Sequence, residues 1–123
     1  MTPSPDLPTA PAALRFGESG LMPAFVTDVS DGKPLMMAFM NEEALRKTLE
    51  TREMHYYSRS RKELWHKGAT SGHTQKVIEM RTDCDQDCIL IEAEINGEDI
   101  ACHTGRESCF YRVVEKDGLV IKD

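Results

Sequence analysis

Oxygen and sulfur ligands alternate in one short stretch of the sequence, DCDQDC, at residues 83–88. Asp83, Asp85 and Asp87 lie at every second position, Cys84 lies among them, and Cys88 follows. Carboxylates that converge repel one another unless a cation lies between them, and hard divalent ions such as Mg²⁺ prefer oxygen ligands. The stretch therefore indicates either a magnesium site or a solvated acidic turn, and its spacing is consistent with both.

The same acidic spacing begins the calcium-binding loop of an EF-hand, in which Glu94 would occupy the twelfth position. Position six of that loop requires glycine for a sharp turn, but here it is Cys88. The residues that follow alternate as in a strand, whereas an EF-hand continues as a helix. An EF-hand is therefore disfavoured.

Two further cysteines, Cys102 and Cys109 in ACHTGRESCF, could join Cys84 around a zinc ion. Three thiolates leave one tetrahedral position open to water, as in a catalytic zinc site. A closed structural site would also use Cys88, and this alternative stays open, as does a role for Cys88 and Cys102 as small core residues. His103 adjoins Cys102 and could also bind zinc.

Composition limits the possible functions of these ligands. The 123-residue chain is long enough for one domain, expected over residues 14–123, and no apolar run is long enough to cross a bilayer. Residues 1–13 are rich in proline, do not resemble a secretory signal, and are expected to be disordered, so a cytoplasmic protein is predicted. A net charge of -6 argues against general nucleic-acid binding.

Basic residues are concentrated between Arg46 and Lys67, where seven basic side chains accompany three acidic ones. A local net charge of +4 in an acidic chain indicates either a site for a small, strongly anionic ligand or a solvated helix face and loop. Charge by itself leaves both interpretations open.

The hydrophobic pattern predicts a small α+β domain with a mostly antiparallel sheet and one or two helices. Residues 24–29 and 34–40 are expected to form a hairpin, and Asn41 is expected to cap a helix over 42–51. Further strands are expected over 54–60, 76–84 and 88–95. The first of these is expected to lead into a polar loop, and residues 68–73 are expected to form a loop of small residues. Asn96-Gly97 predicts a hairpin into 98–104, and the last hairpin is expected within 108–123.

Side-chain alternation gives more detail around the acidic stretch. Ile78, Met80, Thr82 and Cys84 are expected on one face of the strand that precedes it. If residues 83–88 are also extended, the aspartates point to one side and Cys84 to the other. One short stretch could then supply ligands to two metal sites.

Five motifs occur together in one order, and they resemble the phosphoribosyl-AMP cyclohydrolase family of histidine biosynthesis. The motifs are MNEEAL (40–45), YSRSRKELWHKG (57–68), TSGHTQ (70–75), DCDQD (83–87) and CHTGRESCFYR (102–112). The resemblance extends from about Phe16 to Arg112. Cys88 stands where the family more often has a small or apolar residue, and Ala69 stands where many members have Glu.

The resemblance implies a zinc-dependent hydrolase that opens the adenine ring of N1-(5-phosphoribosyl)-AMP between N1 and C6. It also implies an intertwined homodimer with one zinc ion per subunit, bound by Cys102, Cys109 and the partner subunit's Cys84. Asp83, Asp85 and Asp87 would bind magnesium. Many members carry a fused pyrophosphohydrolase domain, and the monofunctional form is expected here.

The two phosphates of that substrate would account for the basic segment. Thiolate ligands make zinc-bound water less acidic than imidazoles do, so a base is expected nearby, with His103 and His73 as candidates. A zinc deaminase would show H-x-E and P-C-x-x-C, which are absent. A non-enzymatic dimerisation module with four zinc-binding cysteines stays an alternative. The residues expected to contact the substrate and its phosphates are Arg59, Ser60, Arg61, Trp65, Lys67, Gly68, Thr70, Ser71 and Gly72.

Overall fold

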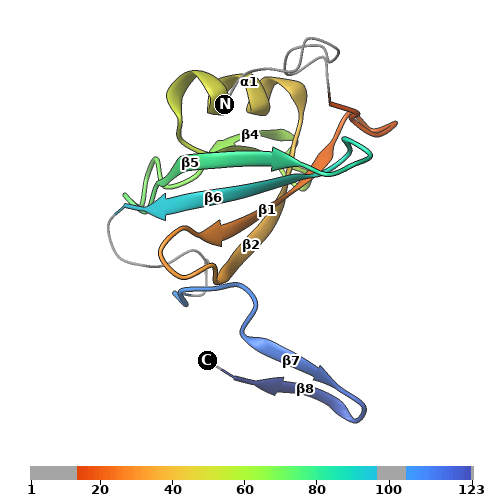
Figure 1. Ribbon diagram of the computed structural model, residues 1–123, viewed down its shortest axis with the longest axis vertical. Helices are drawn as coiled ribbons and strands as arrows, with labels where there is room; N and C mark the ends of the chain where they lie inside the picture. The colour runs from red at the N-terminus through yellow and green to blue at the C-terminus, as the bar shows by residue number, and fades with distance from the viewer. Residues whose placement is uncertain (1–13, 97–104, 123) are drawn as a thin grey trace.

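A computed structural model describes residues 14–96 and 105–122 of the chain (Figure 1). Within these residues, one helix and eight strands form a small α+β fold, as predicted. The bounds of the elements are β1 Met22–Asp28, β2 Pro34–Met40, α1 Glu42–Thr51, β3 His55–Ser58, β4 Glu63–His66, β5 Gln75–Thr82, β6 Ile89–Ile95, β7 Arg112–Glu115 and β8 Gly118–Ile121.

The main sheet has four strands in the order β2-β1-β6-β5, and two hairpins, β3-β4 and β7-β8, form separate two-stranded sheets. Strand pairs are antiparallel except for β1 and β6, which run parallel. The prediction of mostly antiparallel strands is therefore confirmed. The parallel pair places the start of β6 beside the start of β1, and this register fixes where the acidic stretch lies.

The core lies between one face of the main sheet and a layer formed by α1 with the β3-β4 hairpin (Figure 1). Ala24 of β1 and Ile91 of β6 lie on the inner face of the sheet and are buried, as expected for a sheet with one covered face. Leu45 of α1 and Tyr56 of β3 pack against them from the other layer. The Tyr56 hydroxyl donates a hydrogen bond of 2.6 Å to Gln75 Oε1, so this buried polar group is satisfied.

Helix α1 begins as predicted. The Asn41 side chain accepts a hydrogen bond from the Ala44 amide at 2.8 Å, which satisfies one donor of the first turn. Ala44, Leu45 and Thr48 form the buried face. No helix within the described residues has the length and apolar character needed to span a membrane.

Three details of the fold differ from the sequence prediction. Residues 63–66 form β4, although the segment was expected to be a loop, because pairing with β3 outweighs the polar character of its neighbours. A bulge between Val77 and Glu79 shifts the register of β5, so Met80 packs on the core while Ile78 is exposed. Residues 83–88 form a turn where an extended segment was expected.

Two predicted segments lie outside the described residues. They are the Pro-rich extension over 1–13 and the strand expected over 98–104, which includes Cys102 and His103. The other predicted strands and the two remaining hairpins are confirmed within a few residues of their expected bounds.

Candidate active site

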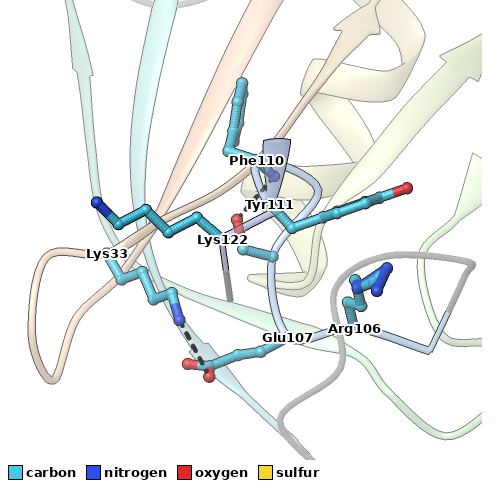
Figure 2. Close-up of a pocket in the computed structure, with 7 residues that line it drawn as sticks. Lys33, Arg106, Glu107, Phe110, Tyr111 and Lys122 are labelled. Atoms are coloured by element: carbon cyan, nitrogen blue, oxygen red, sulfur yellow. Dashed lines mark hydrogen bonds and ion pairs between the residues drawn. The ribbon is translucent and has the colours of Figure 1, made fainter. Parts of the chain in front are cut away.

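The segment that carries Cys109 is anchored to the beginning of β2. The Cys109 amide donates to the Leu35 carbonyl at 2.6 Å, and Ser108 Oγ donates to the Pro34 carbonyl at 2.6 Å. Figure 2 shows an ion pair on the same segment, with Lys33 Nζ 3.3 Å from Glu107 Oε2. The Cys109 side chain is half-buried against the hydrophobic core. These contacts give the thiol a fixed position on the main sheet.

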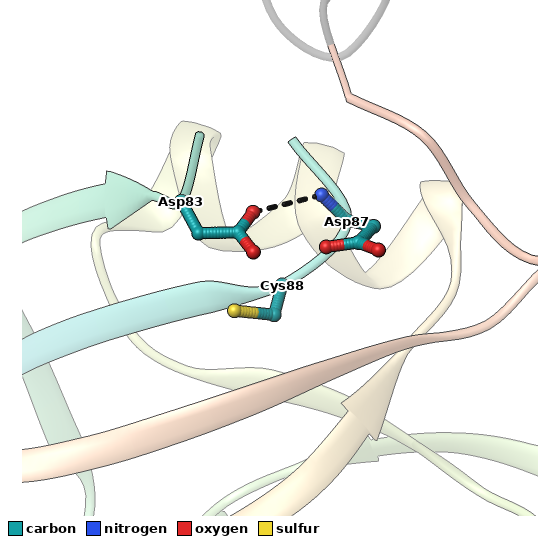
Figure 3. Close-up of side chains that lie close together, drawn as sticks. All are labelled: Asp83, Asp87 and Cys88. Atoms are coloured by element: carbon teal, nitrogen blue, oxygen red, sulfur yellow. Dashed lines mark hydrogen bonds between the residues drawn. The ribbon is translucent and has the colours of Figure 1, made fainter. Parts of the chain in front are cut away.

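The acidic stretch lies at the other end of the main sheet, in the turn between β5 and β6 (Figure 3). Gln86 adopts a left-handed conformation with φ 61°, and its amide donates to the Asp83 carbonyl at 3.1 Å. The chain reverses direction here, which a β-hairpin connection requires. Strict alternation of side chains between two sides therefore does not hold in this turn, and the expectation of an extended segment was wrong.

The turn brings Asp83, Asp87 and Cys88 together, with one ligand atom of each within 4.8 Å of the others. The Asp87 amide donates to Asp83 Oδ1 at 3.1 Å (Figure 3). Asp85 is not a member of this cluster, although all three aspartates were expected to converge. Cys88, whose role the sequence left open, lies beside the two carboxylates.

The two carboxyl groups of this cluster differ in acidity. The hydrogen bond from the Asp87 amide lowers the pKa of Asp83, whereas the hydrogen bond to the Asp83 side chain raises the pKa of Asp87. Burial and the nearby Asp83 carboxylate raise the pKa of the Cys88 thiol. The Asp83 and Asp87 carboxylates repel each other, and a divalent cation between them would remove this repulsion. The two carboxylates therefore fit a hard cation such as Mg²⁺.

The sheet register separates Cys84 from Cys109 within one chain. Thr82, two residues before Cys84, is level with Ile89, Ala24 and Ala38 across the four strands. Cys109 contacts Leu35, which lies three residues before Ala38, near the beginning of β2. From strand geometry, Thr82 on β5 and Leu35 on β2 lie about 10 Å apart along the strands and about 14 Å apart across them. Zinc–sulfur bonds are only about 2.3 Å long. One chain therefore does not bring these two thiols to one zinc ion.

The predicted phosphate-binding residues gather around a cavity of about 430 Å³. His73, one of the two candidate bases, lies in the same wall, and Gly105, four residues before Cys109, borders it as well. The structure thus brings together side chains from β4 and from the loop that follows it. The predicted residues in the lining are Arg61, Trp65, Lys67, Gly68, Thr70 and Ser71.

An adjacent cavity of about 270 Å³ contains the two remaining predicted side chains, Arg59 and Ser60. Arg61 and Trp65 line both cavities, so they form the boundary between them. The Arg59 guanidinium lies 4.2 Å from the centre of the Phe39 ring, which holds it over β2. Gly72 lines neither cavity.

Gly68 determines how closely the loop after β4 folds. It has φ +83°, and a Cβ atom at this position would lie 2.3 Å from the carbonyl carbon of His73. The Gly72 amide donates to the Gly68 carbonyl at 2.8 Å and closes the loop. This close approach brings Thr70, Ser71 and His73 to one cavity wall, which explains why glycine occupies the position.

Lys67 is buried except for about 9 % of its surface, and its ammonium group lies 5.2 Å from the centre of the Trp65 ring. A buried lysine is uncommon because desolvation disfavours its charged form. The position of this cation in a cavity wall, over an aromatic face, is consistent with an anionic ligand.

A histidine pair beside the larger cavity was not singled out from the sequence. His55 and His66 face each other across β3 and β4, and their rings stack with centroids 4.3 Å apart. His66 Nε2 lies 2.7 Å from Glu53 Oε1, and burial lowers the pKa of His55. His55 and His66 meet only because β3 pairs with β4. The sequence predicted a loop in place of β4, so it gave no indication that the two rings would stack.

The sequence model of the family described as phosphoribosyl-AMP cyclohydrolase matches residues 36–111, which is more than half of the chain. The chain belongs to the phosphoribosyl-AMP cyclohydrolase family. The matched region includes both cavities, the acidic turn and Cys109. It ends immediately before β7, so the β7-β8 hairpin lies outside it.

Two relatives in the phosphoribosyl-AMP cyclohydrolase family are similar over most of their length. A protein of that name from Brucella abortus (strain 2308) is 60% identical to this chain, and the matched region covers 85% of this chain and 87% of the Brucella protein. A protein of the same name from Sinorhizobium medicae (strain WSM419) is 58% identical to this chain, and the matched region covers 96% of this chain and 82% of the Sinorhizobium protein.

Proposed function

We propose that this hydrolase opens the adenine ring of N1-(5-phosphoribosyl)-AMP between N1 and C6. The product is the phosphoribosylformimino-aminoimidazole carboxamide ribotide, and the reaction is a step of L-histidine biosynthesis in the cytoplasm. One observation carries the proposal: two adjacent cavities share Arg61 and Trp65, and each contains basic side chains. A nucleotide with a phosphate at each end requires two such cation-lined cavities on either side of its base.

The two phosphates are assigned to different cavities. Arg61 and Lys67 bind one of them, with the hydroxyls of Thr70 and Ser71 donating additional hydrogen bonds. Arg59 and Ser60 bind the other. Trp65 lies between the cavities and provides an aromatic surface for the purine ring.

The thiols fit zinc as a cofactor when two chains combine. Cys109 is held against the core, whereas Cys84 is exposed in a turn far from it along the sheet. The proposed ligands are therefore Cys102 and Cys109 of one chain with the partner subunit's Cys84, which makes the enzyme a homodimer. When bound, zinc supplies the Lewis acidity that activates water for attack on the electron-poor C6.

A base in the chain accepts the proton of that water. His73 is the candidate with a described position, because it lines the larger cavity beside the phosphate-binding residues. His103, the other candidate, adjoins the proposed zinc ligand Cys102. Mg²⁺ at Asp83, Asp87 and Asp85 would hold the turn that carries Cys84, or would neutralise a phosphate of the substrate.

Ring opening of N1-(5-phosphoribosyl)-AMP, followed by absorbance, tests the function directly. We expect turnover by the zinc-loaded protein, loss of turnover after treatment with a zinc chelator, and recovery when zinc is added back. Absence of turnover by zinc-loaded protein would overturn the proposed function. Turnover that persists after complete removal of zinc would overturn the metal assignment and leave the substrate assignment standing.

Replacing Arg59 with alanine tests the phosphate assignment. We expect KM to rise by about 10-fold to 100-fold, because a charge-assisted hydrogen bond is worth about 1.5–3 kcal/mol, with kcat changed by less than about threefold. Arg46→Ala is the matched control, because Arg46 is an exposed cation on α1 that pairs with Glu42 and lines neither cavity. Equal losses in kcat and kcat/KM for Arg59→Ala would instead place this side chain in the chemical step.

A further inference from the structure

Glu53 and His66 form a carboxylate–imidazole pair at the wall of the larger cavity. His66 Nε2 lies 2.7 Å from Glu53 Oε1, and the side chains are 34% and 35% exposed, so the pair is partly shielded from water yet accessible to a ligand. An ionised carboxylate only accepts hydrogen bonds, so Nε2 of His66 carries the hydrogen. The second ring nitrogen, Nδ1, is then a proton acceptor in the neutral ring.

Two backbone contacts fix the position of Glu53. Its amide donates to Thr51 Oγ1 at 3.2 Å, at the end of α1. The same residue forms an antiparallel bridge with Lys76 of β5. The segment between α1 and β3 is therefore held against β5, and the Glu53 carboxylate reaches His66 on β4 from a fixed backbone.

His55 covers one face of the His66 ring. The two rings stack with centroids 4.3 Å apart and an angle of 8° between their planes. His55 Nδ1 donates to the Glu53 carbonyl at 2.9 Å, so Glu53 orients both rings. Burial lowers the pKa of His55, so this ring stays neutral and does not oppose a positive charge on His66.

His66 lies between two residues that the proposed function uses. Trp65, the aromatic surface proposed for the purine ring, precedes it on β4, and Lys67, a proposed phosphate ligand, follows it. All three residues line the same cavity. An oriented proton acceptor therefore adjoins the proposed position of the ring that is opened.

Ring opening requires a second proton transfer after the base has taken the first proton of the water. The water oxygen is then bonded to C6 as a hydroxyl group. As the C6–N1 bond breaks, its electron pair passes to N1, which gains a proton, while the hydroxyl loses its proton and becomes the carbonyl oxygen of the carboxamide. Direct transfer from this hydroxyl to N1 would pass through a strained four-membered ring, so a side chain that relays the proton lowers the barrier.

We propose that His66 is a catalytic residue that relays this proton, and that Glu53 is its positioning residue. Nδ1 of His66 accepts the proton of the C6 hydroxyl and delivers it to N1 as the C6–N1 bond breaks, so the pair neither gains nor loses a proton over one turnover. The Glu53 carboxylate holds the ring in the required tautomer and stabilises the imidazolium that forms between the two transfers. This assignment rests on the proposed function, because it concerns a step of that reaction.

Replacing His66 with glutamine tests the relay in the full-length, zinc-loaded protein with N1-(5-phosphoribosyl)-AMP. The glutamine amide can still donate to Glu53 but cannot carry a proton from one atom to another. We expect kcat to fall by about 10²-fold to 10³-fold, with KM changed by less than about threefold. An unchanged kcat would overturn the assignment of His66 and leave the proposed function standing. Absence of turnover by the parent protein would overturn both.

Glu53→Gln, alone and combined with His66→Gln, tests whether the pair acts as a unit. We expect Glu53→Gln to lower kcat by about 10-fold or more, and the double variant to be no slower than His66→Gln, because Glu53 acts only through His66. Glu50→Gln is the matched control: it makes the same charge change on the exposed face of α1 and should leave kcat unchanged. Losses that multiply in the double variant would contradict the positioning role.

The tautomer of His66 is a readout that depends neither on turnover nor on the folding of a variant. Correlation spectra of ¹H and ¹⁵N in the imidazole rings of the parent protein, recorded at about pH 8.5, should show hydrogen on Nε2 of His66 and none on Nδ1. In Glu53→Gln we expect part of the population to carry the hydrogen on Nδ1, because the glutamine amide can donate to Nε2. A parent protein with the hydrogen on Nδ1 of His66 would overturn the proposal.

Discussion

Replacing Cys109 with serine is expected to abolish ring opening and zinc binding together. Serine keeps the size of the side chain but is a poor zinc ligand, and Cys109 is the proposed ligand whose position the sheet fixes most firmly. We expect turnover to fall by about 10³-fold or more, since the metal activates the attacking water. Metal analysis by plasma mass spectrometry should show that the variant retains almost no zinc.

Cys88→Ser is the matched control for this experiment. The Cys88 thiol lies beside Asp83 and Asp87 in the acidic turn, and not beside Cys109. We therefore expect the Cys88→Ser protein to retain its zinc and most of its activity. Loss of zinc from both variants would instead support a closed four-cysteine site and the non-enzymatic alternative. Thermal unfolding of both proteins checks that neither loss reflects a failure to fold.

Replacing Gly68 with alanine is expected to have the largest effect on stability. The added Cβ would lie 2.3 Å from backbone atoms of His73 and Thr74, and no side-chain movement can relieve a clash with backbone. The residue also has φ +83°, a conformation that is unfavourable for alanine. We expect the free energy of unfolding, measured with urea, to fall by about 3 kcal/mol or more. Because the loop also forms the wall of the larger cavity, KM for the substrate should rise in any protein that still folds.

Gly72→Ala separates steric conflict from backbone conformation. Gly72 has nearly the same conformation, φ +82°, but nothing lies within 4 Å of the position where its Cβ would be. We expect a loss of only about 1 kcal/mol, which is the cost of a left-handed conformation for a residue with a side chain. Equal losses at the two glycines would show that the close approach to His73 is not what fixes residue 68.

The sequence was most informative where the signal is local. The Asn41 cap, the helix over 42–51 and the strand that begins near residue 88 depend on neighbouring residues, and the structure confirms them. The bulge at Ile78 and the presence of β4 depend on which strands pair, and alternation could not predict them. The stacked histidines, His55 and His66, were missed for the same reason.

For the candidate site, residue types and motif order were enough to indicate the family and to name most of the residues that line the two cavities. Only the tertiary structure showed that Arg61 and Trp65 form the boundary between these cavities. Only the sheet register showed that Cys84 and Cys109 lie far apart in one chain. The physical reason is that motifs record which side chains are present, whereas their meeting in space depends on strand order, on the parallel pairing of β1 with β6, and on the turn that reverses the chain at residues 83–88.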